Sequence, residues 1–96
     1  MKRRNEQTIG EVLKTYLKAH GLQRQMAEAE VLDQFALLVG TSKMRYCGDV
    51  RFRSGTLCVE VRSAALKNEL MMNRKYLMDE LNRKAGMDVV ERIYLI

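Results

Sequence analysis

The sequence has little of the residues that usually build metal sites, and it lacks tryptophan and proline altogether. Its 96 residues contain two cysteines, Cys47 and Cys58, and one histidine, His20. These three residues form no zinc-binding pattern, because the cysteines lack the CxxC spacing and the histidine is distant. Two cysteines also do not make the disulfide framework of a small secreted domain. We therefore expect no metal, reduced thiols and a cytoplasmic protein.

Long apolar runs and phosphate-binding loops are also absent. Residues 1–7 are polar, and no stretch approaches the ~20 apolar residues that cross a bilayer, so we expect neither a secretory signal nor a membrane span. The six glycines are isolated from one another, which excludes a GxGxxG motif or a P-loop. Neither cysteine has a base nearby in the sequence that would activate it as a nucleophile. We predict a protein that is not an enzyme and binds no cofactor.

The sequence is rich in positive charge. Its 17 Lys and Arg against 12 Asp and Glu give a net charge of +5. Such an excess favours a polyanionic partner, such as nucleic acid, an acidic protein face or a membrane surface, with an ordinary solvated surface as the alternative. The length corresponds to about one domain. We assign residues 1–7, which include Lys2, Arg3 and Arg4, to a mobile basic arm, and residues 8–96 to a single α+β domain.

Two helices are predicted in the first half of the chain. Thr8 and Glu11 have the spacing of a capping box, and Gly21 suits the left-handed residue that ends a helix. Between them the apolar residues form one helical stripe of Ile9, Val12, Leu13, Tyr16 and Leu17. A second helix is predicted over residues 23–39, ending at Gly40. Its predicted core face consists of Met26, Ala29, Leu32, Phe35, Ala36 and Val39, with Val31 and Leu38 on the flank.

A β-hairpin is predicted from Met44 onward, where the pattern changes to period two. With Ser54 and Gly55 as a two-residue turn, Phe52 lies opposite Leu57, and Val50 lies opposite Val59. One face is then apolar. The other face carries Arg51, Arg53, Glu60 and Arg62, together with Cys47 and Cys58. In this register the two cysteines are four pairs apart, about 13 Å, which is too far for a disulfide.

A third helix and a final strand complete the pattern. Ser63 is the expected N-cap, and the helix is predicted to extend to Lys84 with a bend near Asn73. The strand is predicted over residues 89–96. The resulting order, α-α-β-β-α-β, predicts a three-stranded sheet with helices packed on one face. The arginines of the hairpin would then project from the free face.

The best candidate site is this arginine-bearing face of the hairpin, with Arg51, Arg53 and Arg62. Guanidinium groups bind phosphate well. A second basic group, Lys67, Arg74 and Lys75, is on the third helix, and the two groups would meet if helix and sheet formed a common groove. The alternative is a face neutralised by acidic side chains or covered by a second copy. No aromatic pair of the base-stacking kind is evident, so recognition of specific bases is not supported.

A different class of function is also consistent with the sequence. Seven methionines are many for this length, and methionine serves both as core filler and on adaptable binding surfaces. Met71, Met72 and Met78 would form an apolar patch that grips a partner helix or a second copy, so both a monomer and a homodimer remain open. Binding through such a patch would resist salt, whereas phosphate binding would not.

Several segments together resemble the DciA-like family of small bacterial proteins. The similar segments are residues 9–13, 16–18 and 21–22 for an opening helix, 35–40 for a segment ending in valine and glycine, 55–59 for a hairpin, 61–70 for a serine-led helix, and 81–82 with 85–86 for a leucine-asparagine ending. Their order and spacing extend over residues 8–96.

The resemblance implies a fold similar to the KH domain and a role in DNA replication. It implies a non-enzymatic accessory module that assists loading of the replicative helicase, with DNA favoured over RNA as the nucleic acid. Family members have no known catalytic residues. The residues expected to hold phosphate remain those chosen from the charge pattern, Arg51, Arg53, Arg62, Lys67 and Arg74.

Overall fold

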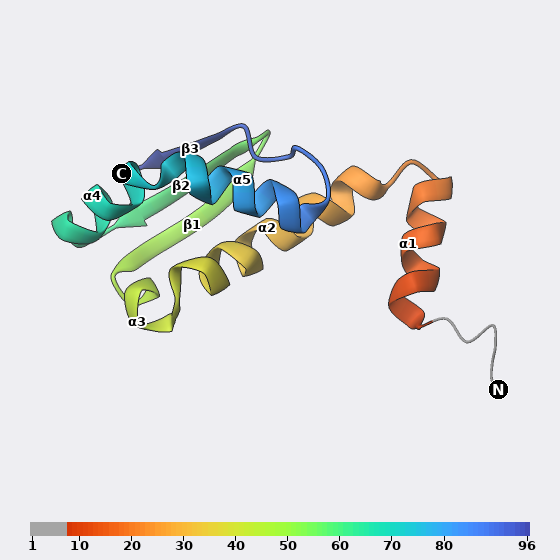
Figure 1. The fold of residues 1–96 in the computed structure, drawn as a ribbon, viewed down its shortest axis with the longest axis horizontal. Coiled ribbons are helices and arrows are strands. Elements are labelled where there is room, and N and C mark those ends of the chain that lie inside the picture. Colours follow the sequence, from red (N-terminus) through yellow and green to blue (C-terminus); the bar gives the residue numbers. More distant parts are fainter. Residues whose placement is uncertain (1–7) are drawn as a thin grey trace.

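The computed structural model describes residues 8–96, so the predicted arm at residues 1–7 lies outside the described part. Residues 8–96 form five helices and a three-stranded sheet, and the predicted α+β class is confirmed (Figure 1). In chain order the elements are α1 (Ile9–Ala19), α2 (Gln23–Val39), α3 (Thr41–Met44), β1 (Cys47–Arg53), β2 (Thr56–Val61), α4 (Ala64–Met72), α5 (Arg74–Ala85) and β3 (Arg92–Leu95).

The sheet has the order β1-β2-β3, with β1 and β2 antiparallel and β2 and β3 parallel. The predicted hairpin register is confirmed, since Phe52 pairs with Leu57 and Val50 pairs with Val59. Ser54 and Gly55 both have positive φ, 51° and 81°. Two such residues are what a type I′ turn needs, and its twist suits the flanking strands.

One prediction for the hairpin is wrong, because Cys47 faces the core. It is 9% exposed and pairs with Val61, because the register shifts between Cys47 and Val50. An extra residue in one strand sends the side chains beyond it to the other face. Gly48 lies in this irregular part, and a Cβ there would clash with the carboxylate of Glu60. The two free cysteines therefore lie on opposite faces of the sheet.

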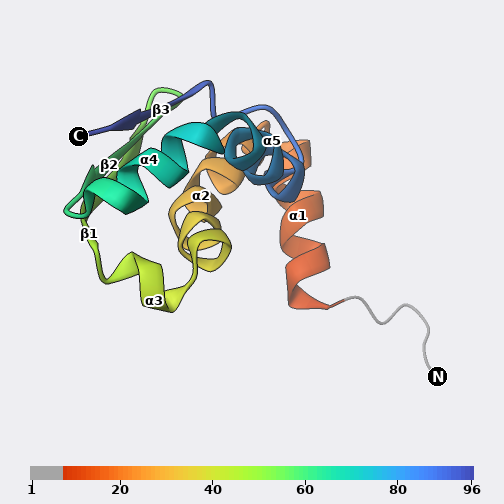
Figure 2. The same cartoon turned by 60° about the vertical axis from the view of Figure 1, so that its left-hand side comes forward.

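The core lies between one face of the sheet and helices α2, α4 and α5, which contact β1, β2 and β3 respectively (Figures 1 and 2). Leu57, Val59 and Phe35 are completely buried there. The face that α2 buries differs from the predicted one. Its buried residues are Ala27, Val31 and Phe35, whereas Leu32 is 40% exposed and Ala29 is exposed. Apolar residues lie on most sides of α2, so periodicity could not select the buried side.

The predicted third helix is two helices, which meet at Asn73. The backbone of Asn73 leaves helical geometry (φ −105°, ψ 15°), and its side-chain amide donates to the Glu69 carbonyl at 2.9 Å. The break lies at the expected bend and lets α4 and α5 follow different directions over the sheet. Residues 41–44, predicted as a connection, form the short helix α3.

The final strand is shorter than predicted, because residues 89–91 are a connection to β3, of which the first two residues are buried. Val89 and Val90 are at most 2% exposed, and Asn82 of α5 holds them in place. Its amide oxygen accepts from the N–H groups of Val89 (3.0 Å) and Val90 (2.8 Å), and its amide nitrogen donates to the Val90 carbonyl (3.0 Å). Asn82 therefore satisfies three backbone groups that no strand would pair.

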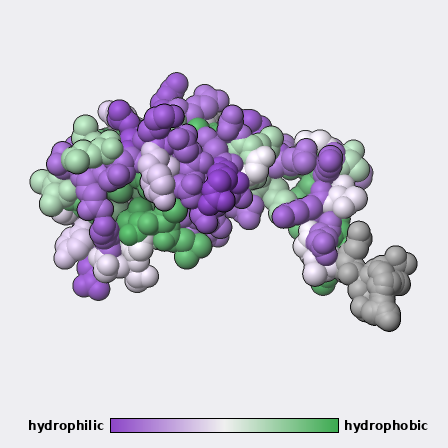
Figure 3. Space-filling view, viewed as in Figure 1, coloured by the Kyte–Doolittle hydropathy of each residue, from purple (hydrophilic) through white to green (hydrophobic). Residues whose placement is uncertain are grey.

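Helix α1 stands apart from the rest of the described chain, which we call the body (residues 23–95). Both ribbon views show α1 projecting beyond the N-terminal end of α2 (Figures 1 and 2). None of its residues is buried. A cavity of about 380 Å³ between α1 and the body is lined by Leu17 of α1 and by Met26 and Ala85 of the body. The rest of the predicted apolar stripe is exposed, and Figure 3 shows apolar surface along α1.

Candidate nucleic-acid interface

The face of the sheet opposite the helices carries the candidate site. Side chains of residues paired across a sheet point to the same side, so the register defines two rows on this face. The first row is Arg51, Cys58 and Tyr94, and the second is Arg53, Thr56 and Arg92. We call these six residues the open face. Each alternates with a core residue such as Leu57, Val59 or Ile93, which are at most 5% exposed.

Three of the six open-face side chains are arginines. Arg51, Arg53 and Arg92 are all exposed. The Nε of Arg51 is 2.5 Å from Oδ2 of Asp49, so one of the three charges is partly neutralised. This pair is well exposed, with 78% of the Arg51 side chain accessible, and exposed pairs contribute little to stability. Arg51 can therefore exchange Asp49 for a phosphate at little cost.

Arg62, the third arginine predicted for the site, lies at the other end of the same side of the sheet. It follows the last residue of β2, and its N–H donates to the Tyr46 carbonyl at 2.7 Å. Its guanidinium and the Glu60 carboxylate both lie over Gly48. The same carboxylate accepts from the Asp49 N–H at 3.1 Å. Arg62 is thus next to an acidic group, whereas Arg53 and Arg92 share a row with a threonine.

The predicted helix group, Lys67, Arg74 and Lys75, belongs to the other layer of the molecule. Lys67 is on α4, and Arg74 and Lys75 begin α5; both helices cover the core side of the sheet. Lys75 also pairs with Asp79 at 3.5 Å. These residues therefore belong to the helix layer, and Arg51 and Arg53 belong to the open face on the other side of the sheet.

The predicted methionine patch is reduced to two exposed residues. Met72 is 77% exposed and Met71 is 49% exposed on α4, whereas Met78 packs against the core. The amide of Asn68 lies 3.6 Å from the sulfur of Met72. Apolar surface on α4 is therefore available, but it is smaller than the sequence predicted.

Two residues of the open face, Arg92 and Tyr94, were missed by the sequence analysis. Both belong to β3, and both alternate with core-facing residues there. Alternation of this kind was visible in the sequence. What the sequence did not provide was the parallel pairing that places Tyr94 beside Cys58 and Arg92 beside Thr56. With them the open face has three arginines and an aromatic ring that is 59% exposed.

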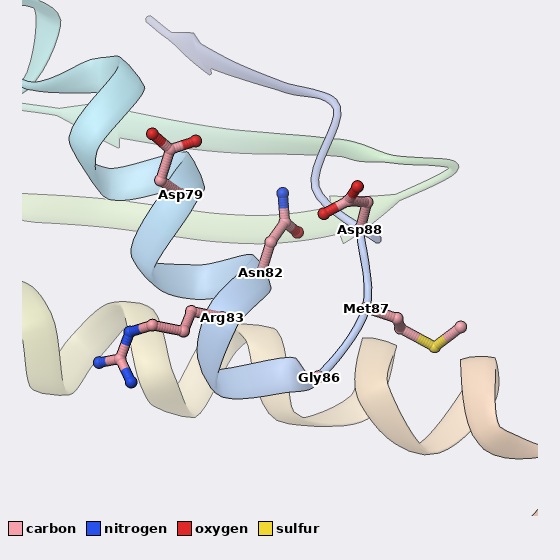
Figure 4. A pocket seen from close by; sticks show the side chains of 6 residues that line it. All are labelled: Asp79, Asn82, Arg83, Gly86, Met87 and Asp88. Atoms are coloured by element: carbon pink, nitrogen blue, oxygen red, sulfur yellow. The ribbon is translucent and has the colours of Figure 1, made fainter.

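A surface cavity lies away from the open face (Figure 4). It is an open hollow of about 420 Å³ at the C-terminal end of α5, lined by Asp79, Asn82, Arg83, Gly86, Met87 and Asp88. Asn82 is engaged with the backbone, and Arg83 forms two hydrogen bonds to Glu80, at 2.9 and 3.2 Å. These contacts raise the pKa of Arg83 and lower that of Glu80. Asn82 and Arg83 therefore serve local structure.

The buried cysteine, Cys47, is also poorly placed for chemistry. Burial raises the pKa of the Cys47 thiol, which disfavours the reactive thiolate. Within residues 8–96, no three His, Cys, Asp or Glu side chains are grouped to hold a metal ion. Over the same residues, every helix is too short or too polar to span a bilayer.

Comparison with known proteins gives one informative result. A family model described as "Dna[CI] antecedent, DciA" matches residues 8–95, which is nearly the whole chain. The match begins at the N-cap of α1 and ends with β3, so it includes every helix and strand described above. Comparison with the curated proteins gives no match. The chain therefore belongs to the DciA family, whose role in DNA replication is that of a helicase-loader accessory and not that of a known enzyme.

Proposed function

We propose that this protein is a non-enzymatic accessory module that binds DNA through its open face while it assists loading of the replicative helicase in the cytoplasm. The observation that carries the proposal is the gathering of Arg51, Arg53 and Arg92 on the sheet face opposite the described helices α2, α4 and α5. Membership of the DciA family supports DNA as the nucleic acid and the helicase as the protein partner.

Electrostatics would dominate such binding. The chain carries a net charge of +5, which attracts a polyanion from a distance. At contact, each guanidinium that pairs with a phosphate releases a condensed counterion, so affinity falls steeply with salt. Within residues 8–96, neither Arg53 nor Arg92 forms an ion pair, and Arg51 pairs with the exposed Asp49.

A charge-reversal series tests the site. In Arg51→Glu/Arg53→Glu we expect DNA affinity at low salt to fall by at least tenfold, with a shallower dependence of log affinity on log salt. Fluorescence anisotropy of a labelled DNA across a salt series measures both. Arg74→Glu/Lys75→Glu makes the same change of charge on the helix layer, and we expect this variant to lose less DNA affinity. An equal or larger loss there would move the site to α5.

A second proposed function is supported by α1. Its exposed residues Ile9, Val12, Leu13 and Tyr16 have the spacing i, i+3, i+4 and i+7 of a helix that docks into an apolar groove of another protein. The charged residues Lys14 and Lys18 lie on the other side of the helix. We propose that α1, with Met71 and Met72 as a second apolar contact, binds the helicase. This contact should resist salt, which separates it from DNA binding at the open face.

A further inference from the structure

We infer that Tyr94 is a base-stacking residue, so that the open face prefers unpaired strands of nucleic acid to duplexes. This inference rests on the proposed binding of DNA by the open face. It adds that the bound DNA is single-stranded. A base in an unpaired strand can turn a π-face toward an exposed aromatic ring, whereas a base inside a duplex has both faces covered by its neighbours.

The position of Tyr94 suits this role. It lies on β3, which is an edge of the sheet, in one row with Cys58 of β2 and Arg51 of β1. Neighbouring strands are about 4.8 Å apart, so the backbone of Tyr94 lies roughly 10 Å from that of Arg51. A base on Tyr94 would thus leave its phosphates within reach of the long arginine side chains.

The sizes of the open-face side chains follow a simple order. The central strand carries the small residues Thr56 and Cys58, and both outer strands carry large ones. A flexible single strand can lie along the central strand between Arg51 and Arg53 on one side and Tyr94 on the other. A rigid duplex presents only its phosphates to such a surface, and would contact the arginines without reaching the ring.

Most of the Tyr94 side chain is accessible to a ligand. Its neighbour in the row, Cys58, has a small side chain, and 59% of Tyr94 remains exposed. Among the described residues, the stacked aromatic pair is Tyr16 with His20 in α1, at a centroid distance of 4.1 Å. Tyrosine next to arginine is also a frequent composition of surfaces that bind single strands, because both present flat groups to bases.

The test compares Tyr94→Leu with a matched control, Tyr76→Leu. Tyr76 is on α5 and has the same exposed fraction, 59%, but lies on the helix layer. The ligands are an oligothymidylate and a duplex of equal length, titrated across a salt series. We expect Tyr94→Leu to weaken binding of the single strand about tenfold, to leave duplex binding nearly unchanged, and to leave the salt slope unchanged, since no charge is lost. Tyr94→Phe should retain the affinity.

Tyrosine fluorescence provides an independent readout, since the chain has four tyrosines and no tryptophan. Stacking should quench part of the emission when the oligothymidylate binds, and Tyr94→Leu should abolish that quenching. An equal loss of affinity for single strand and duplex, or no loss, would overturn the inference. If Arg51→Glu/Arg53→Glu still weakened DNA binding in that case, the proposed function would stand and only the stacking role of Tyr94 would be wrong. If the unmodified protein bound neither ligand at low salt, the proposed function and the stacking role would both be wrong.

Discussion

Helices α1 and α2 follow each other in the chain but relate to the rest of the protein in opposite ways. In α1 the apolar residues form one clean stripe, yet none is buried and Ile9 is 88% exposed. In α2 the apolar residues are spread around the helix, yet Val31 and Phe35 are at most 1% exposed. A clear amphipathic pattern shows that a helix has an apolar side, but it does not show that the same chain covers that side.

The two helices also depend on different interactions. The start of α1 is stabilised locally by a complete capping box, in which Glu11 N–H donates to the Thr8 hydroxyl at 3.1 Å and the Glu11 carboxylate accepts from Thr8 N–H at 2.9 Å. The start of α2 has no side-chain cap. Since short isolated helices are marginal in water, α2 depends on packing, whereas α1 depends on its cap and, in the proposed function, on a partner.

The largest expected difference between α2 and α1 is in their contribution to stability. Phe35→Ala removes a completely buried ring and leaves a cavity, so we expect the free energy of unfolding to fall by about 3–5 kcal/mol. Tyr16→Ala removes an aromatic ring of α1 that is 53% exposed, and we expect a change within about 0.5 kcal/mol. Urea denaturation followed by circular dichroism measures both. A similar loss in both variants would mean that α1 packs on the body in solution.

The next effect concerns binding. In Val12→Asp/Leu13→Asp we expect affinity for the replicative helicase to fall at least tenfold, because charges would enter an apolar contact. Stability should be retained, since both residues are about half exposed. Calorimetric titration of the helicase with each variant measures the loss. Lys14→Gln/Lys18→Gln changes two exposed residues outside the apolar stripe and serves as the control. A loss of affinity in this control equal to that of the double Asp variant would contradict docking through the stripe.

The smallest effect concerns pH and is confined to α1. Hydrogen bonds from the N–H and hydroxyl of Thr8 lower the pKa of Glu11 in the folded protein. Because the folded pKa is depressed, the stabilisation is present above the ordinary glutamate pKa of about 4.3 and is lost as pH falls through the lowered value. We expect hydrogen exchange of α1 amides, after correction for the intrinsic rate, to accelerate in this range while α2 amides stay protected.

Thr8→Ala sharpens the same contrast at neutral pH. It removes the cap, and we expect α1 amides to exchange about fivefold faster, with no change in α2. Hydrogen exchange resolved by residue measures this. Equal acceleration in both helices would show that the cap also stabilises the body.

Local patterns in the sequence were sufficient for part of the fold. The hairpin register followed from a two-residue turn, and Ser54 and Gly55 do form it. The position of Cys47 did not follow, because the irregularity near Gly48 changes the face without changing the period-two pattern. Asn82 was noticed as part of a family-like segment, and only the structure showed that it binds the backbone of residues 89–90.

The candidate site, too, could be predicted from local patterns only in part. Arg51 and Arg53 could be assigned to one face, because alternation within a single hairpin is a local property. The separation of Lys67, Arg74 and Lys75 from that face could not, because it depends on which side of the sheet the helices cover.

The sequence by itself determined the helix and strand types, the caps, the basic character and the alternation that separates arginines from core residues. These properties arise from neighbours a few residues apart. Only the tertiary structure decided that Tyr94 and Arg92 join Arg51 and Arg53, that Cys47 turns inward, and that the apolar side of α1 stays uncovered. The reason is physical: parallel pairing and burial join segments more than 30 residues apart, and their free energy depends on the whole packed arrangement, not on any local pattern.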